Sequence, residues 1–565
     1  MGKWLRVNCV LSFSRDRAPN ELRSGNGDGY RRLSKACLPW IIGICLMGLL
    51  LVAMWFRCRS LANIPGLNGD EAWYGVQAVE MLRGTTTSWL TPTGNPLNPF
   101  FIGPLILLHW WFEPSIVLLR SVAVAGGLLA LVLNWILCRW VYDTRTAWIS
   151  TAVLAVLPIN IAYSRFAWDA SQTLAATLAV MYFALAAVRF PQWKVRLLAA
   201  AIVCQVIAVL VHPTNIFAAT AIAAALAAQW KPGDLVSSIR GSMKHPLVII
   251  AALSICLFIG IWIVWLLCSQ MPHLLEVRLR GLLNSNDILN ALIFYPRLFV
   301  GGTIYRYIAG AHSYFEWPLA FDREGFGVDV PVFWLLILAA GIILWRSWKL
   351  ASRKEDGVLI AALVLELAGF WLFALSRAML PGNERFAICL IAPTAIVLCR
   401  AFALALPRNP PASRAALLAA LLVGWFVLTD FHVHYFRFIE QTGGQAHLTF
   451  RTATEEPKDA ALKYILEHRK PGETLIVAGE WWNLWPLRYL SMAEGDLCVL
   501  KPEEANNEAG KFAAAKNEGG IWYVEFSGSE ALRKIEAELP KKDLDRHEIN
   551  DYGGRPILTV LHIRD

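Results

Sequence analysis

Long apolar runs separated by short polar segments make up most of the chain up to about residue 430. The hydrocarbon core of a bilayer is about 30 Å thick, so a helix that crosses it needs roughly 20 apolar residues. Eleven runs reach or approach this length, which predicts a polytopic α-helical membrane protein with about eleven transmembrane helices. The runs lie at about residues 38–56, 116–138, 147–164, 173–188, 197–211, 214–230, 246–267, 330–346, 357–375, 386–404 and 414–431.

Beyond Gln441 the pattern changes to helical segments that alternate with short apolar strands. This alternation predicts a small α/β domain over residues 440–565. Three tryptophans, Trp481, Trp482 and Trp485, fall on one of its helices, and we assign them to the domain core, with acceptor binding or membrane contact as alternatives. The expected helices are 457–468, 481–490 and 530–539, and the expected strands are 474–478, 497–500, 520–526 and 556–563.

The charges divide the chain at the same place. Residues 440–565 contain 16 Lys and Arg and 22 Asp and Glu, so their net charge is −6. Because the whole chain has a net charge of +9, the first 439 residues have a net charge of +15. The basic residues form no long run, so we expect no nucleic-acid partner. The cysteines form no C-x-x-C pair, so the sequence predicts neither a zinc site nor a disulfide framework.

Lys and Arg in the connecting segments predict the orientation of the helices. With a cytoplasmic N-terminus, the inner segments contain 23 of them and the outer segments contain 11. We therefore expect a cytoplasmic tail at 1–37 and a transmembrane domain at 38–436 with outer loops 57–115 and 268–329. An odd number of helices places the domain 440–565 outside the cytoplasm.

Most of the conspicuous polar residues then fall on the outer face. Asp70 and Glu71 begin an amphipathic stretch in the first outer loop, and Arg165 and Asp169 join two spans. Two carboxylates at one interface suit an active site, because one can remove a proton while the other orients the reactants. The alternatives are structural: Asn68 or Asp70 caps a helix that ends near Arg83-Gly84, the interfacial charges pair with each other, and His212 marks a helix break.

Short motifs in a fixed order add to this picture. The chain resembles the polytopic GT-C glycosyltransferases, and most closely glycosyltransferase family 39, which includes protein O-mannosyltransferases and lipid A aminoarabinose transferases. The resemblance covers about residues 60–405. It is carried by Asp70-Glu71 with Tyr74, Pro96-Leu97 with Pro99, Arg120-Ser121-Val122-Ala123, Ser164-Arg165-Phe166-Ala167 ahead of Asp169, and Arg385-Phe386 ahead of Pro393.

The resemblance implies a transferase that passes a hexosyl or pentosyl group from a polyprenyl-phosphate donor to an acceptor outside the cell membrane. The acceptor is a glycolipid, a glycan or a protein. Because the similar proteins include bacterial ones, the resemblance also implies the bacterial inner membrane. By this likeness Asp70 is the catalytic base, Glu71 supports it and Asp169 is the second carboxylate. No cofactor is implied with certainty, and participation of a divalent metal ion is left open. The likeness assigns the donor phosphate to Arg120, Arg165 and Arg385, and substrate contacts to Tyr74, His212, Tyr305 and Tyr307.

The competing hypothesis is a transporter or flippase of a lipid-linked substrate. Such a protein would contain internal repeats and charged or broken helices near the membrane midplane, and the sequence shows neither clearly. Tyr305 and Tyr307 also fit an aromatic belt at the membrane interface. Glu366 lies inside an apolar run, where we expect it to form a hydrogen bond in helix packing.

Overall fold

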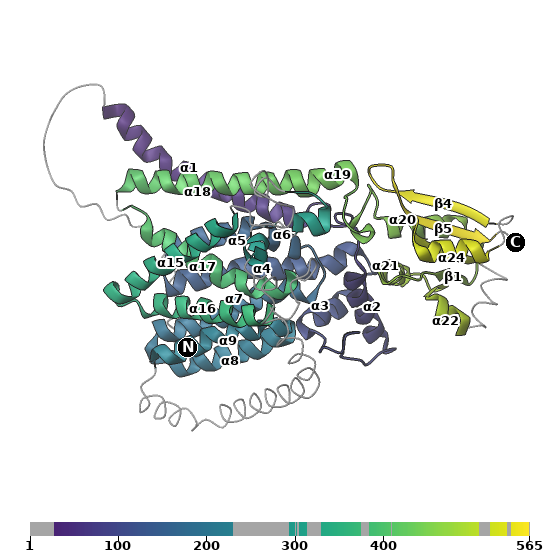
Figure 1. The fold of residues 1–565 in the computed structure, drawn as a ribbon, viewed down its shortest axis with the longest axis horizontal. Helices are drawn as coiled ribbons and strands as arrows, with labels where there is room; N and C mark the ends of the chain where they lie inside the picture. The colour runs from purple at the N-terminus through teal and green to yellow at the C-terminus, as the bar shows by residue number, and fades with distance from the viewer. Residues whose placement is uncertain are drawn as a thin grey trace.

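The computed structural model contains a bundle of long helices and a smaller unit with a β-sheet at one end of it (Figure 1). It describes residues 28–229, 293–299, 301, 304–312, 329–374, 384–407, 409–507, 520–539 and 544–563. The expected span 246–267, most of the expected outer loop 268–329 and most of the expected tail 1–37 lie outside the described residues.

Within the described residues, seven helical segments are long and apolar enough to cross a membrane. They confirm a multi-pass helical membrane protein, while the number of eleven spans stays a prediction. The segments are Trp40–Cys58, Ile116–Val141, Asp169–Arg189, Pro191–Val211, Val330–Ala351, Arg385–Ala405 and Pro410–Thr442. The helices of the bundle are α1 (Asp28–Cys58), α2 (Gly69–Arg83), α3 (Pro99–His109), α4 (Ile116–Val141), α5 (Thr144–Val156), α6 (Pro158–Tyr163), α7 (Thr173–Arg189), α8 (Lys194–Val211), α9 (Ala219–Gln229), α15 (Asp329–Ala351), α16 (Lys354–Ala374), α17 (Ile391–Ala405), α18 (Pro410–Phe431) and α19 (Phe438–Thr442).

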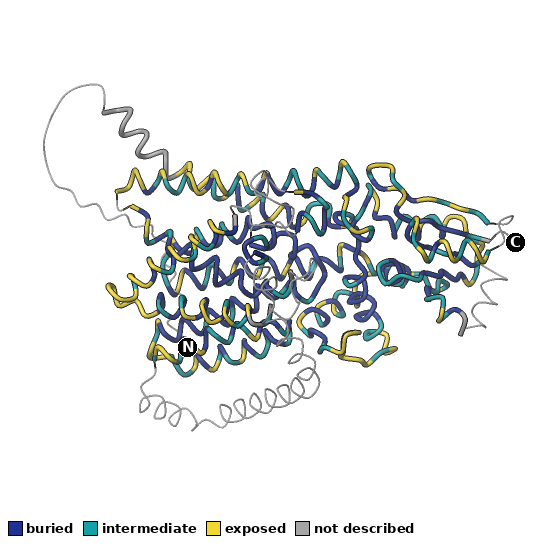
Figure 2. Tube along the Cα trace, viewed as in Figure 1, coloured by how far each residue is buried: buried dark blue, intermediate teal, exposed yellow. Residues whose placement is uncertain are grey.

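Burial separates central from peripheral helices (Figure 2). The apolar segments of α7 and α17 are 78% and 83% buried, whereas those of α1, α15 and α18 are each 22% buried. The peripheral helices expose large apolar side chains such as Ile44, Leu335 and Leu422. A soluble protein rarely exposes so much apolar surface, so these faces are suited to contact lipid.

The expected span 147–164 is broken in the structure. α5 ends at Val156 and α6 begins at Pro158, with Leu157 between them in a non-helical conformation (ψ 122°). Proline has no N–H to donate and disfavours helical geometry in the residue before it. The side chain of Asn160 donates to the carbonyl of Leu154 at 2.6 Å and so satisfies one acceptor at the break.

An ion-pair network around the buried Arg400 joins three helices at one end of the bundle. Arg400 on α17 lies 2.6 Å from Asp143 at the start of α5 and 3.1 Å from Asp356 on α16. These residues belong to three segments, 139–145, 346–356 and 400–414, that the charge pattern places together on the inner side. Their contact shows that the three segments meet at one end of the bundle.

The C-terminal unit contains a five-stranded sheet in the order β2-β1-β3-β5-β4. β1 is parallel to β2 and β3, while β5 is antiparallel to β3 and β4. The strands are β1 (Thr474–Val477), β2 (Leu497–Leu500), β3 (Ile521–Phe526), β4 (Leu544–Asn550) and β5 (Pro556–Ile563), and the helices are α20 (Pro457–His468), α21 (Trp481–Ser491), α22 (Pro502–Asn507) and α24 (Glu530–Glu538). The sheet confirms an α/β fold for this region. The apolar pattern does not predict β4, because this edge strand is rich in charged residues.

α2 lies between the bundle and the C-terminal unit and packs closely against α21. A Cβ atom on Gly69 would lie 2.5 Å from the carbonyl oxygen of Trp481, and a Cβ on Gly75 would lie 2.5 Å from the ring of Tyr489. Any side chain larger than hydrogen would therefore separate the two helices. The first turn of α2, with Asp70 and Glu71, is thus held at the junction of the two parts.

Candidate functional site

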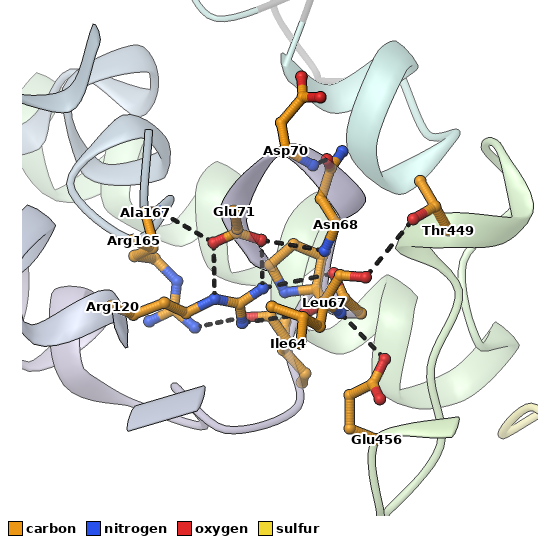
Figure 3. Close-up of polar contacts among 12 residues, drawn as sticks. Ile64, Leu67, Asn68, Asp70, Glu71, Arg120, Arg165, Ala167, Thr449 and Glu456 are labelled. Carbon is orange, nitrogen blue, oxygen red and sulfur yellow. Dashed lines mark hydrogen bonds and ion pairs between the residues drawn. The ribbon is translucent and has the colours of Figure 1, made fainter. Parts of the chain in front are cut away.

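The start of α2 is fixed by a reciprocal cap. The side chain of Asn68 accepts a hydrogen bond from the backbone N–H of Asp70 at 2.7 Å, and Glu71 Oε2 accepts one from the backbone N–H of Asn68 at 3.2 Å. This capping box satisfies backbone donors that a helix leaves free in its first turn. The two neighbouring carboxylates consequently point away from each other (Figure 3).

Glu71 points inward to Arg120, and both side chains are fully buried. Arg120 Nε donates to Glu71 Oε1 at 2.9 Å and Nη2 donates to Glu71 Oε2 at 2.8 Å. The backbone N–H of Ala167 also donates to Glu71, at 2.8 Å. Arg120 donates further to the carbonyls of Leu61 and Pro65, at 3.0 Å each. The pair therefore joins α2 and α4 to two loops.

Arg165 is similarly enclosed. Its guanidinium donates to the carbonyls of Phe56 at 2.5 Å and Ile64 at 2.6 Å, and it lies 4.8 Å from the ring centroid of Phe436. The side chains of Arg120 and Arg165 have no exposed surface. We expected both at the donor phosphate, but in this conformation neither guanidinium can contact a ligand, because protein groups surround them. Their geometry instead supports a structural role.

Asp70 faces the opposite way and remains partly exposed. Its Oδ2 lies 3.6 Å from Arg385 Nη1, and its Oδ1 accepts a hydrogen bond from Trp481 Nε1 at 2.9 Å. Burial raises the pKa of the Asp70 carboxyl above its ordinary value, while Arg385 and Trp481 oppose this rise because they stabilise the charged form. A carboxylate in this setting is suited to accept a proton.

Arg385 has a partly exposed side chain at the start of the span that contains α17. Its side chain is 32% exposed, and that of Asp70 is 30% exposed. The guanidinium lies 5.6 Å from the ring centroid of Trp168 and 5.4 Å from that of Phe386. An ion pair of 3.6 Å is loose for a charge-assisted hydrogen bond, so the guanidinium is able to turn toward an anionic ligand.

Three more of the expected residues gather beside Asp70 and Arg385. Burial, with the nearby carboxylate of Asp169 adding to it, raises the pKa of Tyr74 well above its ordinary value. His212 interacts electrostatically with both Asp169 and Arg385, and burial lowers its pKa and so favours the neutral imidazole. The imidazole is oriented by Thr214, whose Oγ1 lies 2.7 Å from Nδ1. The cluster thus contains Asp70, Tyr74, Asp169, His212 and Arg385.

Tyr305 and Tyr307 have other neighbours. The ring of Tyr305 lies 6.0 Å from that of Phe431 and is fully buried, and the ring of Tyr307 lies 5.3 Å from that of Phe450. Tyr305 thus packs against the end of α18, and Tyr307 packs against the segment that leads into the C-terminal unit. Among the residues that the structure describes, no group of three or more His, Cys, Asp and Glu side chains is arranged to hold a metal ion.

Sequence reasoning missed Trp481 as a member of this cluster. It lies 411 positions from Asp70 along the chain, on a helix that we had assigned to the core of another domain. Its neighbour Trp482 does pack in that core, with its ring 5.9 Å from His447. The sequence does show that α21 is rich in tryptophan. This composition does not specify which of the three indole rings contacts the membrane domain.

No protein-family model and no curated protein matches the chain. The crystal structure of ArnT from Cupriavidus metallidurans in the apo state matches over 93% of this chain and 98% of that one, with a TM-score of 0.50 and 13% identity. The chain is similar in fold to ArnT.

A second ArnT structure, bound to undecaprenyl phosphate, matches over the same shares of both chains with a TM-score of 0.50 and 14% identity. The oligosaccharyltransferase AglB from Archaeoglobus fulgidus, in complex with an inhibitory peptide and a dolichol-phosphate, matches over 87% of this chain and 70% of that one, with a TM-score of 0.43 and 15% identity. At these identities the likeness to ArnT shows the fold of the chain, and that fold agrees with the polytopic helical architecture expected from the sequence.

Proposed function

We propose that this protein is a membrane glycosyltransferase that transfers a sugar from a polyprenyl-phosphate donor to an acceptor on the extracytoplasmic side. The observation that carries the proposal is the pairing of Asp70 with Arg385, both partly exposed, at 3.6 Å. A base and a cation side by side supply the two charges that glycosyl transfer from a lipid phosphate requires. The fold that this chain shares with ArnT, which binds undecaprenyl phosphate, supports the same class of donor.

The reaction is a direct displacement at the anomeric carbon. Asp70 removes the proton from an acceptor hydroxyl while the oxygen of that hydroxyl forms a bond to the anomeric carbon. The bond between this carbon and the phosphate oxygen breaks, and the electron pair leaves with the polyprenyl phosphate. Arg385 stabilises the negative charge that develops on the departing phosphate.

The other members of the cluster orient the reactants. Asp169 interacts electrostatically with Tyr74, and we assign the carboxylate and the hydroxyl to substrate positioning beside the base. The neutral imidazole of His212, with one ring nitrogen turned to Thr214, keeps its other nitrogen for a substrate hydroxyl. Groups that fix a substrate in reactive geometry contribute to the rate without chemistry of their own.

In this proposal residues 1–37 form the cytoplasmic tail, residues 38–436 the catalytic membrane domain and residues 440–565 an extracytoplasmic domain. The orientation rests on the excess of Lys and Arg in the inner segments. The bacterial inner membrane is the location that fits an undecaprenyl-type donor. The acceptor is a glycolipid, a glycan or a protein exposed on the outer side.

The first experiment compares outer-surface glycans and glycolipids of cells with and without the protein, and then assays membranes for the product that differs. Asp70→Asn should reduce transfer by roughly 10²- to 10⁴-fold, the usual contribution of a general base, at unchanged protein level. Asp459→Asn, in the C-terminal unit, is the matched control and should keep full activity. Full activity of Asp70→Asn would remove Asp70 from the reaction.

The same membranes test the phosphate role of Arg385. Arg385→Ala should lower kcat and raise the KM for the lipid donor, because both the departing phosphate and the bound donor phosphate lose their cation. Arg196→Ala is the matched control, since Arg196 also lies over an aromatic ring, at 5.1 Å from the centroid of Trp193. An unchanged donor dependence in Arg385→Ala would exclude Arg385 from the phosphate site.

A further inference from the structure

The two oxygens of the Asp70 carboxylate are held by different parts of the protein. Oδ2 faces Arg385 from the membrane bundle at 3.6 Å, while Oδ1 accepts the indole N–H of Trp481 from the C-terminal unit at 2.9 Å. The two contacts together define the plane of the carboxylate. With either contact removed, the side chain gains rotational freedom and the lone pairs of the base lose their direction.

The approach of Trp481 depends on the close packing of α2 against α21. A Cβ on Gly69 would lie 2.5 Å from the carbonyl oxygen of Trp481 and 2.8 Å from Cδ1 of its ring. The first contact involves backbone, which cannot move aside as a flexible side chain could. Because Gly69 has no side chain, the indole of Trp481 can approach closely enough to reach Asp70.

A second contact fixes the far end of α21. The hydroxyl of Tyr489 donates to the carbonyl of Ser115 at 3.1 Å and accepts from the backbone N–H of the same residue at 3.2 Å. Ser115 caps the start of α4. The ring of Trp485 lies 5.2 Å from that of Trp481 and supports it from the side. The helix that carries Trp481 is thus anchored to the membrane domain along its length.

We propose that Trp481 is a positioning residue for Asp70, so that the C-terminal unit completes the catalytic base of the membrane domain. This inference rests on the proposed function, in which Asp70 accepts the proton of the acceptor. The indole N–H holds Oδ1, and the remaining lone pairs of the carboxylate face the site. The C-terminal unit therefore takes part in catalysis through its contact with Asp70.

The first test replaces the indole without removing the aromatic ring. Trp481→Phe should lower kcat by roughly ten- to a hundredfold, the range that corresponds to one hydrogen bond to a charged group, with little change in the KM for the lipid donor. Trp482→Phe, on the next position of the same helix, should leave both values unchanged. Equal effects of the two substitutions would reduce the role of Trp481 to support of the fold.

The pH profile separates positioning from general damage. The N–H of Trp481 stabilises the ionised form of Asp70 and so lowers its pKa. Without this donor the pKa rises, and because the base acts in its ionised form, the acid limb of the kcat profile should move to higher pH in Trp481→Phe. A profile with lower rates and an unmoved acid limb would overturn the proposal.

A readout without substrate uses a carbodiimide, which reacts with protonated carboxyl groups. Labelling of the peptide that contains Asp70, followed by mass spectrometry across a pH series, should reach its midpoint at higher pH in Trp481→Phe and in Gly69→Ala than in the wild type. Gly103→Ala is the control, since a Cβ on Gly103 would meet nothing within 4 Å. Coincident midpoints in all four proteins would contradict the proposal.

The two hypotheses fail in different ways. Full activity of Asp70→Asn would contradict the proposed function, whatever the labelling shows. An inactive Asp70→Asn together with a wild-type pH profile in Trp481→Phe would keep the proposed function and overturn the role of Trp481.

Discussion

Asp70 and Glu71 are adjacent and chemically alike, yet they have opposite environments. Glu71 is fully buried and engages Arg120 through both oxygens, whereas Asp70 is partly exposed beside Arg385. The capping box at Asn68 produces this difference, because it turns Glu71 back toward the start of the helix. One carboxylate therefore maintains the fold while its neighbour is available for chemistry.

Substitution should separate these two roles. Glu71→Gln leaves the guanidinium of Arg120 buried without its counter-charge, and the loss of one partner from a buried pair costs roughly 3 to 5 kcal/mol. We expect a lower unfolding temperature in detergent and reduced protein in membranes. Asp70→Asn should unfold close to the wild-type temperature. The same unfolding temperature for both variants would contradict the distinction.

The sequence indicated which polar residues lie on one face, but it did not indicate which arginines the fold would enclose. Asp70, Asp169 and Arg385 follow from the order of polar motifs on one face, and the structure brings them together with Tyr74 and His212. Arg120 and Arg165 belong to the same motifs, but backbone carbonyls at Leu61 and Ile64 occupy their donors. The direction in which backbone carbonyls of a loop point depends on the tertiary fold. The pattern of side chains along the sequence does not determine it.

At the scale of elements, α2 is the helix on which the site depends. Asn68 caps its start, Gly84 ends it in the left-handed conformation (φ 72°), and Gly75 brings it against α21. The sequence indicated these boundaries, because a capping residue and a terminal glycine have local signatures. It did not indicate the partner helix, since α21 is distant in the chain and its packing partner follows from the tertiary fold.

Gly75→Ala tests the packing of α2 against α21. Alanine favours a helix over glycine by about 1 kcal/mol, but overpacking typically costs about 1 to 3 kcal/mol. We expect the cost to prevail, because the new methyl group would meet the fully buried ring of Tyr489 at 2.5 Å. Limited proteolysis should cut the C-terminal unit faster in Gly75→Ala than in Gly103→Ala. Equal rates of cleavage would show that the ring of Tyr489 moves aside at little cost.

At the scale of the whole molecule, hydropathy and charge predicted a membrane bundle followed by a different kind of unit. The structure confirms the helical membrane class and the α/β sheet. Hydropathy could not predict the break at Pro158, because the residues on both sides of it remain apolar. It also could not predict that the C-terminal unit contributes Trp481 to the site.

Reporter fusions test the proposed orientation. An alkaline phosphatase fused after residue 565 should be active, because it needs an oxidising compartment outside the cytoplasm, and a green fluorescent protein at the same place should be dark. The same reporters fused in the inner segment 400–414 should give the reverse result. A fluorescent C-terminal fusion would contradict the orientation and with it the outer location of the site.

The contact between Asp70 and Trp481 joins residues that are 411 positions apart. A ribosome that adds about 5 to 20 residues per second needs roughly 20 to 80 s to proceed from the first to the second. During that interval Asp70 has already left the ribosome while the residue that orients it has not been made. In the roles proposed above, a chain that ends before α21 lacks the indole that orients Asp70, so we expect it to transfer sugar more slowly than the full chain.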